Sequence, residues 1–146
     1  MDLYPKQYLY RRVVRAKLYI DENFAGPIDL GSISDEACFS KFHFVRLFKE
    51  IYGRTPHQYL THVRVEKARE YLAAGDTVAR VCYSVGFDSV SSFTGLFKRR
   101  VGMTPAVYQA EKLLIKESVT SRPLEFIPGC FAVKSRSGEK LAIFEK

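Results

Sequence analysis

Apolar residues recur at helical spacing through most of the chain, and one stretch of this pattern occurs twice. When the sequence is shifted against itself by 49 positions, residues 89–108 align with residues 40–59, and nine of the twenty aligned positions are identical. The identical pairs are Ser40/Ser89, Phe44/Phe93, Leu47/Leu96, Phe48/Phe97, Lys49/Lys98, Gly53/Gly102, Thr55/Thr104, Pro56/Pro105 and Tyr59/Tyr108. Directly upstream the offset is 48, which indicates one extra residue in the turn of the second copy. The sequence therefore predicts a duplicated helical unit.

The first copy has the pattern of a helix, a tight turn and a second helix. Asp29 is a candidate N-cap, and the inward positions of the helix after it fall at i, i+3 and i+7, at Leu30, Ile33 and Ala37. Ser40 is the expected N-cap of the next helix, and Gly53 its expected end. The inward stripe of this second helix is Phe44, Leu47, Phe48 and Ile51.

The second copy repeats this arrangement downstream. Thr77 is a candidate N-cap, Gly86 supplies the turn, Asp88 or Ser89 opens the second helix, and Gly102 ends it. A Thr-Pro pair at 104–105 then starts another short helix. The inward positions of this copy are Val78, Val81, Val85, Phe93, Leu96, Phe97 and Val101.

A linking helix without breaking residues is expected between the copies, over about residues 57–74. Thr55, Pro56 and Gln58 are the types preferred at the N-cap, first and third positions of a helix, and Gly75 follows the expected end. Such a helix spans roughly 27 Å at 1.5 Å per residue. Successive major-groove faces of B-DNA lie about 34 Å apart, so a rod of this order can hold two recognition helices in adjacent grooves.

The expected fold class is all-α, with two helix-turn-helix subdomains joined by a long linker helix, like a pair of homeodomains, and a short irregular or β-containing C-terminal tail. One domain is placed at residues 1–109, with its first unit at about 5–56, its linker at about 57–74 and its second unit at about 76–109. Residues 4–23 are expected to form an additional helix on the first unit. Residues 110–146 form an extension in which residues 131–133 and 141–144 are candidate short strands or ordered coil.

Charge and cysteine content narrow the function classes. The net charge is +7, and residues 1–39, 40–109 and 110–146 contribute −1, +6 and +2, so the positive excess lies in the repeated segment. A basic segment of this kind favours a polyanionic partner, because each neutralised phosphate releases counterions. The three cysteines (Cys38, Cys82 and Cys130) are an odd number without close pairing, which favours a reducing cytoplasm over a disulfide framework. No stretch is apolar and long enough for a membrane span.

The side of each second helix opposite its inward stripe carries the candidate contact chemistry. In the first copy this outward stripe is Phe42, Val45, Arg46 and Lys49, with Lys41 beside it. Arginine can bond guanine bidentately, apolar side chains can press on thymine methyl groups, and lysine can meet phosphate. The alternative is a solvated helix face with scattered apolar residues.

In the second copy the matching stripe is smaller and more polar. It comprises Ser91, Thr94, Gly95 and Lys98, with Val90 and Ser92 beside it. Arg99 and Arg100 follow as candidate phosphate contacts, although a solvated charge run is the alternative. Because Gly95 replaces the arginine of the first copy, the second unit is expected to position the protein on DNA more than it discriminates sequence.

Two segments of the first copy resemble the first recognition unit of the AraC/XylS family of transcription regulators: residues 39–49 (FSKFHFVRLFK) and 53–60 (GRTPHQYL). Residues 81–89 (VCYSVGFDS), 93–99 (FTGLFKR) and 102–108 (GMTPAVY) resemble the second unit. The resemblance covers about residues 5–109. Cys38 departs from it where the family's first turn favours glycine, and Gly95 departs where arginine is common.

The resemblance implies a DNA-binding domain of seven helices, whose third and sixth helices enter consecutive major grooves of bacterial promoters, here about residues 40–52 and 89–101. It implies RNA polymerase as a partner and monomeric binding of the small single-domain type, with a fragment of a longer regulator as the alternative. The family's base-contacting positions correspond to Phe42, Val45, Arg46, Val90, Ser91, Ser92, Thr94 and Gly95. The function expected is sequence-specific binding of double-stranded DNA to regulate transcription.

The sequence also bears on two other function classes. An enzyme or metal site would have to use the cysteines and His43, His57 and His62, but no sequence motif for metal, nucleophile or phosphate-binding loop is present. We therefore expect neither catalysis nor a cofactor. The alternative to sequence-specific binding is a protein-interaction module with only non-specific affinity for DNA.

Overall fold

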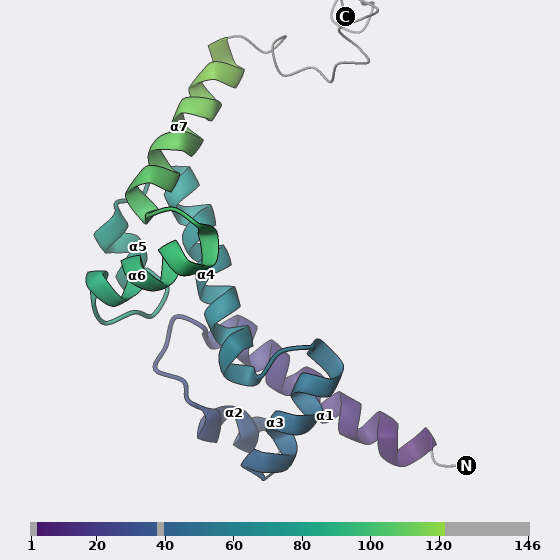
Figure 1. Ribbon diagram of the computed structural model, residues 1–146. Helices are drawn as coiled ribbons and strands as arrows, with labels where there is room; N and C mark the ends of the chain where they lie inside the picture. Colours follow the sequence, from purple (N-terminus) through teal and green to yellow (C-terminus); the bar gives the residue numbers. More distant parts are fainter. Residues whose placement is uncertain (1–2, 38–39, 122–146) are drawn as a thin grey trace, which may run out of the picture. The chain divides into compact units, whose positions relative to one another are not determined.

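The computed structural model describes residues 3–37 and 40–121, which form seven α-helices and no strand (Figure 1). The helices are α1 (Leu3–Asn23), α2 (Leu30–Ala37), α3 (Lys41–Tyr52), α4 (Pro56–Ala74), α5 (Val78–Ser84), α6 (Val90–Val101) and α7 (Pro105–Ser121). The expectation of an all-α fold with two helix-turn-helix motifs is confirmed. We call α2 with α3 the first motif and α5 with α6 the second motif. The candidate strands of the tail, and Cys38 and Cys130, lie outside the described residues.

Local signals in the sequence set most helix ends. Thr55 and Gln58 form the expected capping box at the start of α4, in which Thr55 Oγ1 accepts from Gln58 N at 3.2 Å and Gln58 Oε1 accepts from Thr55 N at 3.0 Å. Gly53 closes α3 in the left-handed conformation, at φ 70°, which glycine adopts without steric cost. Ser40 does stand at the N-cap of α3, but its side chain makes no capping bond, whereas Ser89 caps α6 by accepting from Ser92 N at 3.2 Å.

The first hydrophobic cluster joins α1, α2, α3 and the first turns of α4. Its largest fully buried side chains include Phe44 and Phe48, whose ring centroids lie 5.6 Å apart on α3. Ile33 and Ala37 of α2 are buried as predicted, but the prediction of Leu30 as an inward residue is wrong, since it is 37% exposed. Leu30 is the first residue of α2 and lines an open groove together with residues of α3.

The second cluster joins the later turns of α4 to α5, α6 and the start of α7. Phe93 and Phe97 of α6 are fully buried, with ring centroids 5.7 Å apart, so they repeat the aromatic pair of the first motif. The buried members of this cluster are Val65, Ala68, Leu72, Val81, Cys82, Val85, Phe93, Phe97 and Tyr108. The sequence repeat is therefore a repeat of packing, in which the same stripe faces inward in each copy.

A polar contact fixes α1 on α4. Tyr59 donates its hydroxyl proton to Asp21 Oδ1 at 2.7 Å, and Lys17 Nζ donates to Asp21 Oδ2 at 2.8 Å. Burial raises the pKa of Tyr59, and the hydrogen bond to Asp21 raises it further, so the phenol remains a donor. Tyr59 and Asp21 are 38 residues apart in sequence, so this hydrogen bond holds together two helices that are distant along the chain.

The helix α7 is longer than the short helix expected after Thr104. It runs for 17 residues, because no glycine or proline interrupts the sequence between Pro105 and Ser121. By internal contacts the chain divides into two compact units, residues 1–109 and 110–146, and the boundary falls within α7. No helix of the described part of the chain is long and apolar enough to cross a lipid bilayer.

The capping box generates a stability prediction. Thr55→Ala removes the acceptor for Gln58 N, so we expect a loss of about 1 kcal/mol in the free energy of unfolding, measured by urea denaturation. Thr55→Ser keeps a hydroxyl acceptor and serves as the control that retains nearly all of this stability. Equal stability of the alanine and serine variants would show that the cap does not stabilise α4.

Candidate nucleic-acid interface

The outward face of α3 carries the side chains predicted for contact in the first motif. Phe42 is 90% exposed, an unusual state for a phenylalanine. Val45 is half-buried, and Lys41, Arg46 and Lys49 are exposed. Because Phe44 and Phe48 fix the opposite side of α3 in the core, this stripe is directed to solvent by packing rather than by chance.

Part of this stripe lines a groove of about 500 Å³ that also includes one residue from α2. Its lining residues are Leu30, Lys41, Phe42, Val45 and Arg46. Leu30 was missed as a site residue because its helical spacing matched that of the inward positions of α2. Its place in the first turn of a short helix was the only sequence signal for this outcome. The groove combines an apolar lining with two cations, which suits contact with bases and phosphates together.

The side chain of Lys41 lies against the start of α2. Its Nζ is 3.6 Å from the position that a Cβ on Gly31 would occupy. Hydrogen bonds from Ser32 lower the pKa of the nearby Asp29 carboxyl, and the charge of Lys41 adds to this effect. Asp29 Oδ1 accepts from Ser32 N at 2.8 Å, so the predicted cap of α2 is present. Lys41 thus offers its ammonium group at the point where α2 and α3 approach each other.

The outward face of α6 holds the residues predicted for the second motif. Val90, Ser91, Ser92, Lys98 and Arg99 are exposed, whereas Thr94 and Gly95 are half-buried. Ser92 has a structural use as well, because its hydroxyl accepts a hydrogen bond from Ser89 Oγ at 2.9 Å in the cap of α6. The stripe on α6 therefore has the same direction relative to its aromatic pair as the stripe on α3, but shorter side chains.

Arg99 lies over the place where Gly95 lacks a side chain. Its Nη1 is 3.6 Å from the position that a Cβ on Gly95 would occupy. In the sequence repeat Gly95 corresponds to Arg46, and Arg99 corresponds to Glu50. The first motif therefore presents a guanidinium group from Arg46. The second motif presents one from Arg99, which lies one helical turn after the position equivalent to Arg46.

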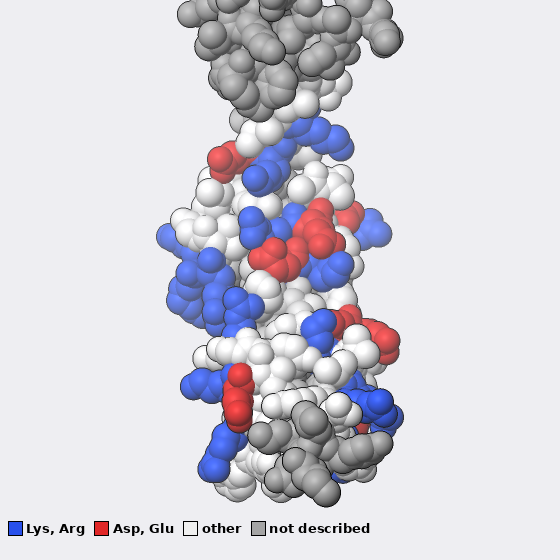
Figure 2. Space-filling model, turned by 90° about the vertical axis from the view of Figure 1, so that its right-hand side faces the viewer, with Lys and Arg blue, Asp and Glu red and all other residues white. Residues whose placement is uncertain are grey.

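Two basic residues of the linking helix form ion pairs, whereas the basic residues of the two outward stripes form none within the described part of the chain. On α4, Lys67 pairs with Glu70 and Arg69 pairs with Glu66, each at 3.0 Å. Among residues 3–37 and 40–121, no ion pair involves a lysine or arginine of α3 or α6. Figure 2 shows one face of the molecule, on which carboxylates lie among basic side chains and a basic group gathers at one edge. Unpaired cations are the ones that can neutralise phosphates without first breaking a contact.

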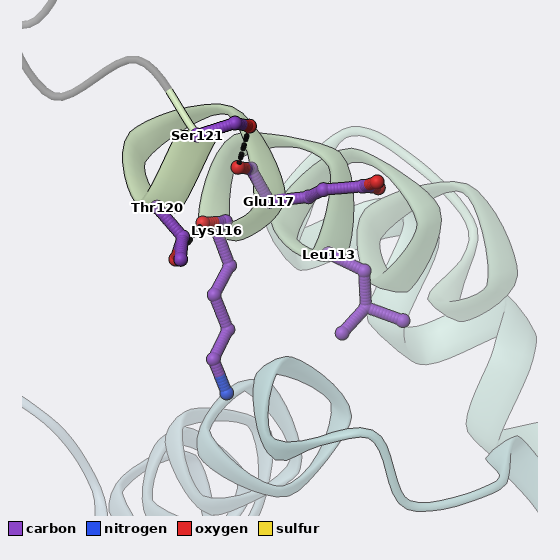
Figure 3. Close-up of a pocket in the computed structure, with 5 residues that line it drawn as sticks. All are labelled: Leu113, Lys116, Glu117, Thr120 and Ser121. Atoms are coloured by element: carbon purple, nitrogen blue, oxygen red, sulfur yellow. Dashed lines mark hydrogen bonds between the residues drawn. The ribbon is translucent and has the colours of Figure 1, made fainter.

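A second hollow, of about 450 Å³, lies along the last turns of α7 in the unit that begins at Ala110 (Figure 3). Its hydroxyl groups serve their own helix, since Thr120 Oγ1 donates to Lys116 O at 2.8 Å and Ser121 Oγ donates to Glu117 O. Within the described residues no three His, Cys, Asp or Glu side chains stand close enough to hold a metal ion. The strongest candidate for a functional site therefore remains the pair of outward stripes on α3 and α6.

Comparison with known proteins agrees with this geometry. A family model described as a helix-turn-helix domain matches residues 33–111, which is more than half of the chain and contains both motifs. The protein belongs to the AraC family of helix-turn-helix transcription regulators. The AraC-type match ends shortly after the start of α7, so most of that helix lies outside it.

Several AraC-family regulators are similar in sequence. The MmsAB operon regulatory protein of Pseudomonas aeruginosa is 37% identical over 92 residues, which are 62% of this chain and 30% of that protein. The bifunctional transcriptional activator/DNA repair enzyme AdaA of Bacillus subtilis is 36% identical over 92 residues, 62% of this chain and 44% of that protein. The TetD protein of transposon Tn10 from Escherichia coli is 33% identical over 97 residues, 66% of this chain and 70% of that protein. The chain thus spans less than half the length of the first two relatives.

Solved structures show the same AraC-type fold. The C-terminal domain of AraT, a response regulator from Geobacillus stearothermophilus, matches with a TM-score of 0.66 and 28% identity, over 68% of this chain and 84% of that one. The DNA-binding domain of AdpA, solved in complex with a target DNA, matches with a TM-score of 0.65 and 27% identity, over 77% of this chain and 96% of that one.

The opposed faces of α3 give a prediction for this AraC-family domain. Phe44→Ala should lower the free energy of unfolding by about 3–5 kcal/mol, since it empties a fully buried aromatic site. Phe42→Ala removes the same side chain from the exposed face and should change stability by less than about 0.5 kcal/mol. Urea denaturation of both variants checks the assignment. A large loss for Phe42→Ala would show that this ring is buried and not available to a ligand.

Proposed function

We propose that the protein is a sequence-specific transcription regulator that binds promoter DNA by inserting α3 and α6 into adjacent major grooves. One observation carries this proposal. In a single compact unit, two helices related by the sequence repeat each bury the same aromatic pair and turn a stripe of contact residues toward solvent. The 19 residues of α4 between the motifs correspond to roughly 28 Å at 1.5 Å per residue, which is of the order of the groove repeat.

In the first motif the side chains suit base discrimination. Arg46 is exposed and can donate two hydrogen bonds to the O6 and N7 atoms of guanine. Phe42 and Val45, with Leu30 beside them in the same groove, offer apolar surface to thymine methyl groups. Lys41 and Lys49 flank this surface and serve as phosphate contacts. We assign most of the sequence preference to this motif.

In the second motif the side chains suit positioning. Ser91, Ser92 and Thr94 are small hydroxyl residues that can bond either a base edge or a phosphate, beside Val90 and the gap at Gly95. Lys98 and Arg100 are exposed cations for the phosphate backbone, and Arg99 brings its guanidinium over Gly95. The sequence preference of this motif is therefore expected to be weaker and to depend mainly on Arg99.

The relatives support the proposal that the protein regulates transcription. The AdpA domain of the same fold is bound to a target DNA, and curated relatives are named as regulators of transcription. On this basis we propose that the protein binds its site as a monomer in the bacterial cytoplasm and acts on RNA polymerase there. Although AdaA is named as a repair enzyme as well, the function proposed for this chain consists of contacts and requires no catalytic step or cofactor.

A second candidate function is a protein-interaction module. The observation that favours it is the exposure of Phe42 beside an apolar groove, because exposed apolar patches commonly mark protein-binding surfaces. Such a module would bind DNA only through its net positive charge. The two functions therefore differ in whether any DNA sequence is preferred.

Selection from random duplexes by the purified chain distinguishes them. We expect an enriched site with two conserved blocks about 10 base pairs apart, one strongly and one weakly conserved. The logarithm of the affinity for this site should fall linearly with the logarithm of salt concentration, and preference for it should persist over the range. If no sequence is enriched and binding disappears at moderate salt, the interaction module is the better description.

Arg46 provides the sharpest single-residue prediction. Arg46→Ala should relax base preference at one or two positions of the strongly conserved block, at a cost of about 1–3 kcal/mol in binding free energy. Arg54→Ala is the matched control, since it removes an exposed guanidinium just after α3 but outside the stripe. Competition between site variants in a binding assay measures both effects. If Arg46→Ala weakens all sequences equally, Arg46 contacts phosphate and not a base.

A further inference from the structure

The segment that leads into the first motif lies directly against the turn of the second motif, beside the linking helix. The meeting point, which we call the junction, consists of residues 24–28 between α1 and α2, Arg64 in the middle of α4, and residues 86–88 between α5 and α6. Residues 25–28, Arg64 and residues 86–88 line one cavity of about 500 Å³. Phe24 packs against both hydrophobic clusters. The junction therefore connects the core of the first motif with that of the second.

Arg64 bonds the segment that precedes the first motif. Its Nε donates to Phe24 O at 2.8 Å and its Nη2 donates to Gly26 O at 3.0 Å. A guanidinium has its donors in a rigid planar fork, so two such bonds fix both the distance and the angle between α4 and these carbonyl groups. Arg64 is half-buried, which limits competition by water for the same acceptors.

The same guanidinium group lies against the turn of the second motif. Its carbon is 5.8 Å from the centroid of the Phe87 ring, within the range of a cation–π contact. Gly86 has φ +94°, and a Cβ on it would be 2.9 Å from Phe24 O and 3.0 Å from Arg64 Nη2. Any side chain at this position would collide with the backbone of the first motif's leading segment. The turn of the second motif can approach this closely only because residue 86 is glycine.

We infer that Arg64 is a positioning residue that sets the relative orientation of α3 and α6, and through it the spacing of the two DNA half-sites. The inference rests on the proposed function. A linking helix alone does not fix this orientation, because long helices are rarely straight and curve gently. A lateral contact between the motifs, with Arg64 bonded to one side and stacked against the other, removes this freedom.

The orientation of α3 relative to α6 determines which half-site spacing on DNA the protein can bind. With about 10–10.5 base pairs in a turn, each base-pair step rotates a groove by roughly 34° around the helix axis. A protein with two rigidly held recognition helices therefore binds one half-site spacing well and its neighbours poorly. When the two motifs move independently, the second motif is no longer held at the position of its own half-site after the first has bound. Its effective concentration at that half-site is then lower.

The test compares full sites, half-sites and altered spacings, using the complete chain. Duplexes carry the selected site, the same site with the weaker block scrambled, or the site with one or two base pairs inserted between the blocks. Arg64→Ala should lower affinity for the full site about tenfold, leave affinity for the half-site within about twofold and flatten the dependence on spacing. Arg64→Lys keeps the charge but loses the fork, so we expect an intermediate loss.

Two further variants separate positioning from folding. Gly86→Ala forces the junction apart from the other side and should produce the same pattern as Arg64→Ala. Arg69→Ala is the matched control, because Arg69 also lies on α4 but bonds Glu66 and Tyr108 instead of the junction. It should keep the wild-type dependence on spacing. Thermal unfolding of each variant shows whether a loss of binding follows a loss of folded protein.

The outcomes are distinct for the two proposals. If the wild-type chain selects a two-block site and Arg64→Ala keeps its spacing preference, the inference about Arg64 is wrong and the proposed function stands. The same conclusion follows if Arg64→Ala weakens half-sites as much as full sites. If the wild-type chain selects no site at all, the proposed function fails, and the inference fails with it.

Discussion

Each recognition helix is held by three aromatic rings, and the direction of its exposed face depends on them. On α3, Phe44 packs on Phe48, and the ring of Tyr59 meets Phe48 edge-on with centroids 5.6 Å apart. On α6, Phe93 packs on Phe97, and Tyr108 meets Phe97 edge-on at 5.5 Å. Aromatic side chains bury large areas and prefer such tilted contacts. Because these rings anchor one side of each helix to the helix that follows, the opposite side is left for a ligand.

The repeat preserves packing and changes chemistry. The aromatic triplet recurs at equivalent positions, whereas the exposed stripe changes from Phe42 and Arg46 on α3 to Ser91 and Gly95 on α6. Packing within a core tolerates little change in volume, but an exposed stripe has no such restriction. Two copies of one scaffold can therefore divide the work of binding, with one discriminating bases and the other adding phosphate contacts and orientation.

The junction joins the two copies of the repeat to each other. Arg64 lies between Leu60, which is buried in the first cluster, and Val65, which is buried in the second. It thus lies on the part of α4 where residues of the first cluster are followed by residues of the second. Gly86 completes this contact by allowing the turn of the second motif to approach the carbonyl groups of residues 24 and 25. In our proposal, a pair of motifs linked in this way binds as one surface, whereas two motifs on a plain tether would bind as separate parts.

Helix positions, most helix ends and the buried stripes could be predicted from the sequence, because they depend on local signals. Helical spacing identified Phe44, Phe48, Phe93 and Phe97 as inward, and the Thr55–Gln58 box and Gly53 marked helix ends through short-range hydrogen bonds and backbone conformation. Spacing also defined the outward stripes. The prediction of a short helix after Thr104 is wrong, because the sequence has no breaking residue between Pro105 and Ser121 and the helix continues through it.

The tertiary structure decided what each face meets. Helical spacing places Leu30 on the same side as Ile33, but in the folded protein Ile33 is buried in the core and Leu30 is exposed in a groove beside α3. Likewise, Arg64 is one of several basic residues on α4, and nothing in its neighbours distinguishes it. Its acceptors are backbone carbonyl groups about 40 residues away, and backbone acceptors have no side-chain signature. The sequence thus determined the two motifs, and the contacts between distant segments determined how they are held together.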